Sequence, residues 1–163
     1  MKEKYQEFLE LVEGNQGILH KVCRLYASAE ESPDLIQDML VSLWKAYPSF
    51  RGESKPTTWM YRIALYTALS YRKYASYRKF DALEENFDMA QTEDMAAAEA
   101  HEIITHALRK LPDDDRALML LYLEEHSYEE ISGILGISVS NVGVRLSRTK
   151  KRLKTIIEKQ SNG

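Results

Sequence analysis

Residues 127–154 read SYEEISGILGISVSNVGVRLSRTKKRLK, and this stretch decides the fold of the C-terminal third of the chain. Ser127 and Glu130 have the spacing of a capping box, in which each side chain bonds the backbone N–H of the other residue at a helix start. Gly136 follows a short apolar helix and tolerates the positive φ of a sharp turn. Ser138 then caps a second helix. Two helices joined by a short glycine turn predict a helix-turn-helix.

The second of these helices combines one apolar stripe with a basic surface. The stripe consists of Val139, Val142, Leu146 and Leu153. The other faces carry six basic side chains, at Arg145, Arg148, Lys150, Lys151, Arg152 and Lys154. A basic second helix is typical of helix-turn-helix proteins that place this helix in the major groove of DNA. The alternative is a helical hairpin with a solvated basic face, but the acids gathered in and near the first helix argue against it.

Side-chain length and polarity suggest how this helix would contact DNA. Ser140, Asn141 and Arg145 could reach base edges from the start of the helix, and Ser138, which opens the helix, is a further expected contact with DNA. Arg148 and Lys151, further along, are suited to phosphates.

Charge is strongly segregated along the chain, although the net charge is only -3. Residues 51–80 carry 7 basic and 1 acidic side chains, and residues 132–163 again carry 7 and 1. Between them, residues 81–131 carry 3 basic and 15 acidic side chains. Two basic blocks separated by an acidic stretch suggest two surfaces that bind polyanions. Solvated helix faces are the alternative that charge alone leaves open.

The remaining composition excludes several classes of protein. The lone Cys23 cannot form an internal disulfide, and four scattered His have no zinc-finger spacing. Neither an apolar run of about 18 residues nor a signal-peptide pattern occurs. We therefore expect a cytoplasmic protein without membrane insertion, metal or cofactor. Since no acid–base or nucleophile constellation stands out, we do not expect an enzyme.

Apolar residues recur at helical spacing through most of the chain, and no strand-like alternation occurs. We predict helices over residues 5–27 with an interruption at 14–17, from a cap at Ser32 to 47, and over 59–78 with Thr57 or Thr58 as the cap. Two more are predicted over residues 99–111 and 116–124. The predicted fold is all-α, with small helical domains at 1–80 and 99–163 joined by an acidic linker at 81–98.

Several of these segments resemble extracytoplasmic-function (ECF) sigma factors of bacterial RNA polymerase. The stretch 108–112 (LRKLP) with Arg116, followed by 127–131 (SYEEI), 135–138 (LGIS) and 145–148 (RLSR), resembles their domain that binds the promoter −35 element. Residues 34–38 (DLIQD) with Leu43 and Trp44 resemble their polymerase-docking helix. Residues 49–54 (SFRGES) and 58–64 (TWMYRIA) resemble the loop and helix that open and recognise the −10 element. The similarity covers nearly the whole chain in the family's order.

The resemblance implies that core RNA polymerase and promoter DNA are the partners, and that an anti-sigma protein supplies control. It assigns polymerase binding to a helix whose Asp34, Gln37 and Asp38 lie together on one side. Leu35 and Trp44 belong to the same expected contact, although Trp44 could equally be part of the core. Read alone, this segment could also be an ordinary solvated face over an apolar stripe.

For the −10 element, the resemblance points to the loop and helix that follow. Phe50, Arg51 and Lys55 supply an aromatic ring and two cations in a short polar loop, suited to a base flipped out of the duplex. The expected contacts on the next helix, at spacings that share one face, are Trp59, Arg62, Tyr66 and Lys73. The alternative for Trp59 and Tyr66 is that both merely pack in the core.

The chain departs from the family pattern at four positions. Tyr66 and Ser70 stand where relatives usually carry Asn and Asp, and Gly143-Val144 replaces the usual polar pair of the recognition helix. We therefore expect a −35 preference that differs from that of typical relatives, whereas Tyr66 and Ser70 leave the −10 preference open. The alternative function is a DNA-binding regulator that does not bind polymerase, but this would not account for the DLIQD helix or the basic-aromatic block.

Overall fold

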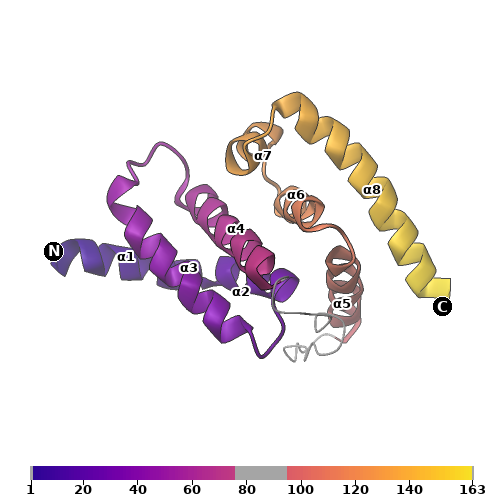
Figure 1. Cartoon of the computed structure of the whole chain (residues 1–163), viewed down its shortest axis with the longest axis horizontal. Helices are drawn as coiled ribbons and strands as arrows, with labels where there is room; N and C mark the ends of the chain where they lie inside the picture. The colour runs from indigo at the N-terminus through magenta and orange to yellow at the C-terminus, as the bar shows by residue number, and fades with distance from the viewer. Residues whose placement is uncertain (1, 76–94, 163) are drawn as a thin grey trace. The chain divides into compact units, whose positions relative to one another are not determined.

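The computed structural model describes residues 2–75 and 95–162, and all regular structure within these ranges is helical (Figure 1). The chain forms two compact units, Met1–Glu84 and Glu85–Gly163. The all-α prediction is therefore confirmed for the described residues. The predicted domain boundaries stay predictions, because most of the acidic segment 81–98 lies outside the described residues.

The described part of the N-terminal unit contains four α-helices and one short 3-10 helix. They are α1 (Lys2–Gly14), α2 (Gln16–Tyr26), α3 (Ser32–Ala46), η1 (Tyr47–Ser49) and α4 (Pro56–Ala75). The core lies among α2, α3 and α4, which pack against one another (Figure 1). On α3, the buried side chains are Leu35, Met39 and Leu43. Their four-residue spacing puts them on one helix face, and burial of this face against α4 orients the opposite face outward.

The start of α3 differs from the prediction that Ser32 caps it. Ser28 and Glu31 instead form the reciprocal pair: the Glu31 backbone N–H donates to Ser28 Oγ, and the Ser28 N–H donates to Glu31 Oε1, each at 3.2 Å. Ser32 lies inside the helix and donates its hydroxyl hydrogen to the Ser28 carbonyl at 3.0 Å. The predicted caps Thr57 and Thr58 are also wrong, because α4 already begins at Pro56. Proline suits a first helical position, where its missing N–H costs nothing.

Glu31 also ties α3 to α4. The Tyr71 hydroxyl donates to Glu31 Oε2 at 3.0 Å. Partial burial would by itself raise the pKa of Glu31, but hydrogen bonds from Ser28 and Tyr71 and the charge of Arg72 lower the pKa below its ordinary value. The bonded form in the folded protein is therefore the carboxylate.

The C-terminal unit contains α5 (Met95–Arg109), α6 (Asp113–Leu123), α7 (Tyr128–Leu135) and α8 (Val139–Asn162). Helix α5 begins four residues before the predicted start, so residues 95–98 of the predicted linker are helical. Helix α6 begins three residues before the predicted start at 116, and the charge of the three acids in its first turn complements the helix dipole. The buried face of α8 consists of Val142, Leu146, Thr149 and Leu153. Val139, predicted to belong to this face, is instead 43% exposed.

A buried arginine holds α5 and α6 together. Arg116 on α6 is 2% exposed, and its guanidinium donates to the carbonyls of Leu108 at 3.1 Å, Arg109 at 2.6 Å and Leu111 at 2.9 Å. These carbonyls lie at and just beyond the end of α5, where a helix leaves its last C=O groups without intrahelical partners. An Asp113 oxygen lies 3.5 Å from Arg116 Nη1 and offsets its charge. Arg116 thus fixes the turn between the two helices.

We expect Arg116→Met to destabilise the C-terminal unit by about 3 kcal/mol, because several buried carbonyls lose a charged donor. Both tryptophans, Trp44 and Trp59, lie in the N-terminal unit. Denaturant unfolding followed by circular dichroism should therefore shift, while tryptophan fluorescence should not. Arg148→Met, which removes an exposed arginine from the same unit, is the control. Equal unfolding curves for the two variants would contradict this role of Arg116.

We expect Tyr71→Phe to destabilise the N-terminal unit by about 1 kcal/mol at pH 7, because Glu31 loses a hydrogen bond. Since folding lowers the pKa of Glu31, its contribution is present above the ordinary glutamate pKa and is lost as the pH falls through the lower folded value. The difference between variant and wild type should therefore shrink in acid. Fluorescence-detected unfolding at pH 7 and pH 4 measures this, with the exposed Tyr74→Phe as control. A difference that stays constant with pH would argue against the carboxylate.

Candidate nucleic-acid interface

The turn between α7 and α8 has the predicted geometry. At the start of α7, the Glu130 N–H donates to Ser127 Oγ at 3.1 Å and the Ser127 N–H donates to Glu130 Oε1 at 3.2 Å. Gly136 ends α7 in the left-handed region, with a φ of 70°. Ser138 Oγ accepts the N–H of Asn141 at 3.1 Å and caps α8. The predicted capping box, glycine turn and second cap are therefore confirmed, and α7 and α8 form a helix-turn-helix (Figure 1).

Helix α8 exposes most of the side chains predicted to contact the −35 element. These exposed residues are Ser138, Ser140, Asn141, Arg148 and Lys151. Arg145 differs, because only 26% of its side chain is exposed. It lies at the edge of the exposed face, next to the buried stripe.

A carboxylate on α6 explains the position of Arg145. Asp115 Oδ1 accepts from Arg145 Nη2 at 3.1 Å, and Asp115 Oδ2 accepts from Arg152 Nη1 at 3.1 Å. The sequence did not indicate this pairing, because helical spacing within α6 does not reveal which acid faces α8. Asp115 and Arg152 are thus parts of the site that sequence reasoning missed.

Lys150 is turned toward α6 as well. Its Nζ lies 4.0 Å from the centroid of the Tyr122 ring. A hydrogen bond with Tyr122 raises the pKa of Lys150. Contact with an aromatic ring favours the cation.

The Gly143-Val144 pair interrupts the exposed polar side chains of α8 with an apolar stretch. Val144 is 56% exposed. A Cβ added at Gly143 would meet the Tyr128 ring at 3.6 Å, which is ordinary van der Waals contact. Gly143 is therefore not required by close packing against α7.

On α3, the residues predicted to dock on polymerase divide into two groups. Asp34, Gln37 and Asp38 are exposed and share one face. Leu35 is 0% exposed, so it holds this face in place from the core and offers no surface to a partner. Trp44 is 43% exposed and shows one side to solvent.

Trp44 belongs to a series of aromatic contacts that runs from α1 to α4. Its ring packs against Tyr5 and Phe8, with centroids 5.6 and 5.0 Å away. Phe8 in turn lies 5.3 Å from Tyr47. Tyr47 lies 6.2 Å from Trp59, and Phe50 lies 4.8 Å from the same ring. The sequence did not reveal Tyr5, Phe8 or Tyr47 as neighbours, because these contacts join helices that are distant along the chain.

The loop before α4 is open and basic, as predicted. Arg51 and Lys55 are exposed, and Gly52 adopts a φ of 74°. Phe50, the predicted aromatic residue of this loop, is half-buried. One side of its ring is covered because it stacks on Trp59.

Three of the four residues predicted to share a face of α4 are exposed. Arg62, Tyr66 and Lys73 all reach solvent, and Tyr66 is 74% exposed. Trp59 is half-buried within the aromatic series, so it supports the start of this face rather than extending it. The alternative that Tyr66 packs in the core is therefore wrong.

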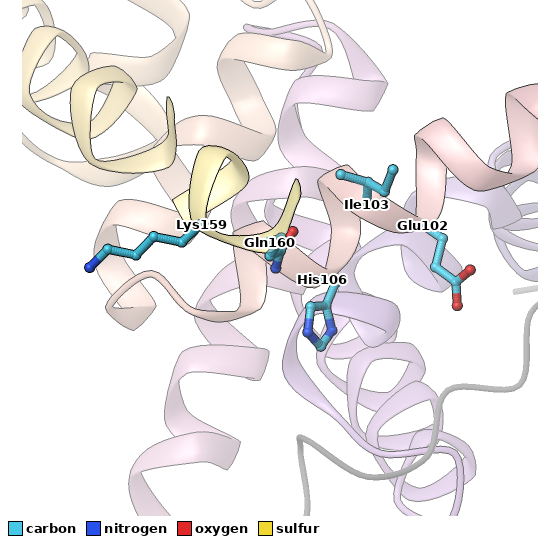
Figure 2. Close-up of a pocket in the computed structure, with 5 residues that line it drawn as sticks. All are labelled: Glu102, Ile103, His106, Lys159 and Gln160. Carbon is cyan, nitrogen blue, oxygen red and sulfur yellow. The ribbon is translucent and has the colours of Figure 1, made fainter. Parts of the chain in front are cut away.

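A shallow groove between α5 and α8 contains none of the predicted site residues (Figure 2). Glu102, Ile103 and His106 line it from α5, and Lys159 and Gln160 line it from α8. In Figure 2 the charged ends of Glu102 and Lys159 point away from each other.

Three further properties of the described residues concern metal ions, the lone thiol and membranes. No cluster of three or more His, Cys, Asp or Glu that could hold a metal ion occurs among them. Burial raises the pKa of the Cys23 thiol to about 12, so this thiol is not a nucleophile at neutral pH. None of the helices in ranges 2–75 and 95–162 is long and apolar enough to cross a membrane.

Comparison with known proteins defines the class of the molecule. Residues 11–77 match the family model "Sigma-70 region 2", and residues 101–153 match "Sigma-70, region 4". Both halves of the chain are therefore those of a bacterial sigma factor. The chain belongs to the ECF sigma factors, which direct RNA polymerase to promoters.

Two curated relatives support the membership. The chain is 33% identical to the ECF RNA polymerase sigma-E factor of Escherichia coli (strain K12) over 156 residues, which covers 85% of this chain and 82% of the relative. It is 34% identical to RNA polymerase sigma factor YlaC of Bacillus subtilis (strain 168) over 147 residues, or 85% and 84% of the two chains. The alternative of a regulator that does not bind polymerase is therefore wrong.

Two solved structures share the fold. The sigma factor RpoE in complex with the anti-sigma factor NepR from Bartonella quintana superposes with a TM-score of 0.72 at 22% identity, over 97% of this chain and 98% of that chain. CnrH, in complex with the cytosolic domain of CnrY, gives a TM-score of 0.66 at 22% identity, over 94% and 89%.

We expect Gly143→Ala to stabilise the C-terminal unit by about 1 kcal/mol, because alanine favours a helix interior and its Cβ has room. Gly136→Ala should destabilise the unit by about 1 kcal/mol, because Gly136 has a positive φ. Denaturant unfolding followed by circular dichroism compares the two variants with wild type. A loss of stability in Gly143→Ala would show that the contact with Tyr128 is tighter than this geometry implies.

Proposed function

We propose that this sigma factor uses three surfaces of its two units, one to bind polymerase and two to bind promoter DNA. The exposed side of α3 docks on core polymerase, the loop before α4 together with α4 holds the opened −10 element, and α8 contacts the −35 duplex. The observation that carries this proposal is the exposed row of Arg62, Tyr66 and Lys73 beside the stacked pair of Phe50 and Trp59. A folded core does not require an open tyrosine ring between two cations.

At the −10 element, Tyr66 supplies the aromatic ring of this row, and its side chain is largely exposed. A base flipped from the duplex stacks on Tyr66, while Arg62 and Lys73 contact the phosphates on either side. Each stacked base contributes about 1–3 kcal/mol, which is comparable to the few kcal/mol that unstacking costs. Binding of the opened strand thus shifts the duplex equilibrium without ATP or a covalent step.

The stacked pair of Phe50 and Trp59 forms a wall at the start of this row. Arg51 and Lys55 in the exposed loop contact the backbone of the displaced strand. Since Tyr66 and Ser70 replace the usual polar residues of relatives, stacking contributes more to −10 recognition here and hydrogen bonds to base edges contribute less.

At the −35 element, we propose that Ser140, Asn141 and Arg145 contact base edges and that Arg148 and Lys151 contact phosphates. Ser138 positions the start of the helix through its cap. Val144 presents methyl groups where relatives carry a polar side chain, and Gly143 presents none. We therefore expect a −35 preference that differs from that of typical relatives, with a larger share of the affinity in phosphate contacts.

For polymerase docking, Asp34, Gln37 and Asp38 form an exposed polar face that can pair with basic residues of a partner helix. Trp44 adds a partly exposed apolar edge to this face. An anti-sigma protein that covers such surfaces would keep the factor inactive. The NepR and CnrY complexes of two proteins with the same fold support this proposal. We also propose a cytoplasmic location, because transcription is initiated there.

We expect Tyr66→Ala to reduce run-off transcription from a duplex promoter by roughly tenfold, because a stacking ring is lost. The loss should be smaller on a template with a pre-melted −10 region, where the duplex no longer has to be opened. Run-off assays with core polymerase and both templates measure this. Tyr74→Ala is the matched control, because Tyr74 is a 70% exposed tyrosine on the same helix but outside the row. Equal transcription by the two variants would refute the proposed role of α4.

A further inference from the structure

We propose that Asp115 is a positioning residue for promoter recognition, which fixes the guanidinium groups of Arg145 and Arg152 at the edge of the recognition helix. The inference rests on the proposed function of α8 as the −35 contact. It adds a specificity determinant on a different helix, one that need not touch DNA.

The geometry is that of one carboxylate shared by two arginines. Each oxygen of Asp115 accepts one bond, from Arg145 Nη2 and from Arg152 Nη1, both at 3.1 Å. The two arginines are seven residues apart, so they lie on the same side of α8 about 10 Å apart along its axis. Asp115 therefore draws two side chains that lie two helical turns apart toward one point.

The exposure of the three side chains shows how firmly each is held. Asp115 is 18% exposed and Arg145 is 26% exposed, so this bond is largely shielded from water. Arg152 is 56% exposed and forms the outer part of the cluster. A shielded ion pair is screened less by salt than an exposed one. Arg145 is thus the better-fixed of the two arginines.

Arg145 still has donors available for DNA. Its bond to Asp115 uses Nη2, and a guanidinium has five N–H donors in all. Asn141 and Arg148, one turn away in either direction, are exposed. The pair with Asp115 therefore leaves Arg145 beside the surface that meets DNA.

Fixing an arginine in advance changes the selectivity of its contact. A free arginine loses rotamer freedom when it binds, but it can also swing to satisfy a wrong base or a phosphate. A fixed arginine loses less freedom at the matching base and cannot follow a mismatched one. The carboxylate also offsets part of the positive charge that would attract any phosphate. Both effects raise the ratio of specific to non-specific binding.

The Gly143-Val144 pair makes this contribution more important. These two positions offer no polar side chain, so Arg145 is the first long polar side chain after Asn141. A recognition helix with few polar contacts depends more on the accuracy of each one.

The test compares Asp115→Asn with Asp114→Asn in holoenzyme assembled from the full chain and core polymerase. Asp114 is exposed in the same first turn of α6, so its substitution removes the same charge without releasing the arginines. Holoenzyme is allowed to select from promoter fragments randomised over the −35 element. Its retention on fragments that lack this element is measured in parallel.

We expect Asp115→Asn to lower the ratio of selected to non-specific binding by roughly five- to tenfold, while non-specific retention rises. Asp114→Asn should leave the ratio unchanged. In a background where both arginines are replaced, Arg145→Ala with Arg152→Ala, Asp115→Asn should have no further effect on the ratio. Asp115→Glu keeps the charge but moves the carboxylate, so it should lower the ratio without raising non-specific retention. This variant also provides the measurement if Asp115→Asn fails to fold.

Equal ratios for Asp115→Asn and Asp114→Asn would overturn the inference, since the carboxylate would then act only as a general charge. A full effect of Asp115→Asn in the background that lacks both arginines would also overturn it. Wild-type holoenzyme that selects no −35 sequence would instead refute the proposed function of α8, and the inference with it. Selection by wild type with unchanged selection by Asp115→Asn would refute the inference alone.

Discussion

The guanidinium of Arg116 satisfies the carbonyls at the end of α5, and the packing of α6 and then of α8 within the C-terminal unit depends on this contact. Three short bonds from a buried cation fix where α6 begins relative to α5. Asp115 is the preceding residue, so its carboxylate projects from a helix start that Arg116 has already anchored. Helix α8 packs on α6, and its Arg145 meets this carboxylate. Two successive residues thus have different roles. Arg116 bonds α5 and stabilises the fold, whereas Asp115 bonds α8 and positions its arginines.

The N-terminal unit joins its surfaces through aromatic rings rather than through one charge. Trp44, at the edge of the proposed docking face, packs on Phe8, and the series continues through Tyr47 to Trp59 and Phe50 beside the loop before α4. Aromatic pairs add roughly 0.5–1.5 kcal/mol each beyond the area they bury. The docking face and the loop therefore rest on one packed layer. A loop with a positive-φ glycine and two exposed cations has little internal stability, and this layer fixes its two ends.

How far the sequence predicted the molecule depended on the distance over which each feature is determined. The capping box at Ser127 and the turn at Gly136 were predicted correctly, because both depend on a few adjacent residues. The start of α3 was not, because Ser28 and Ser32 are both plausible caps and the position of Glu31 decides between them. Val139 was placed in the core by periodicity, yet it lies in the first turn, where the core no longer covers α8. The pairing of Asp115 with two arginines required the packing of α6 on α8, which no local pattern encodes.

Folding pairs part of the charge that is segregated along the sequence. The acids of residues 113–115 belong to the acidic middle of the chain, and the cations of residues 145–152 belong to its basic end. Folding brings one carboxylate of the first block to two guanidinium groups of the second. Part of the basic charge is thus neutralised at the flank of α8, whereas Arg148 and Lys151 remain exposed. The same helix can therefore attract the DNA backbone with its free cations and keep its held arginines from binding phosphate indiscriminately, which a uniformly basic helix could not do.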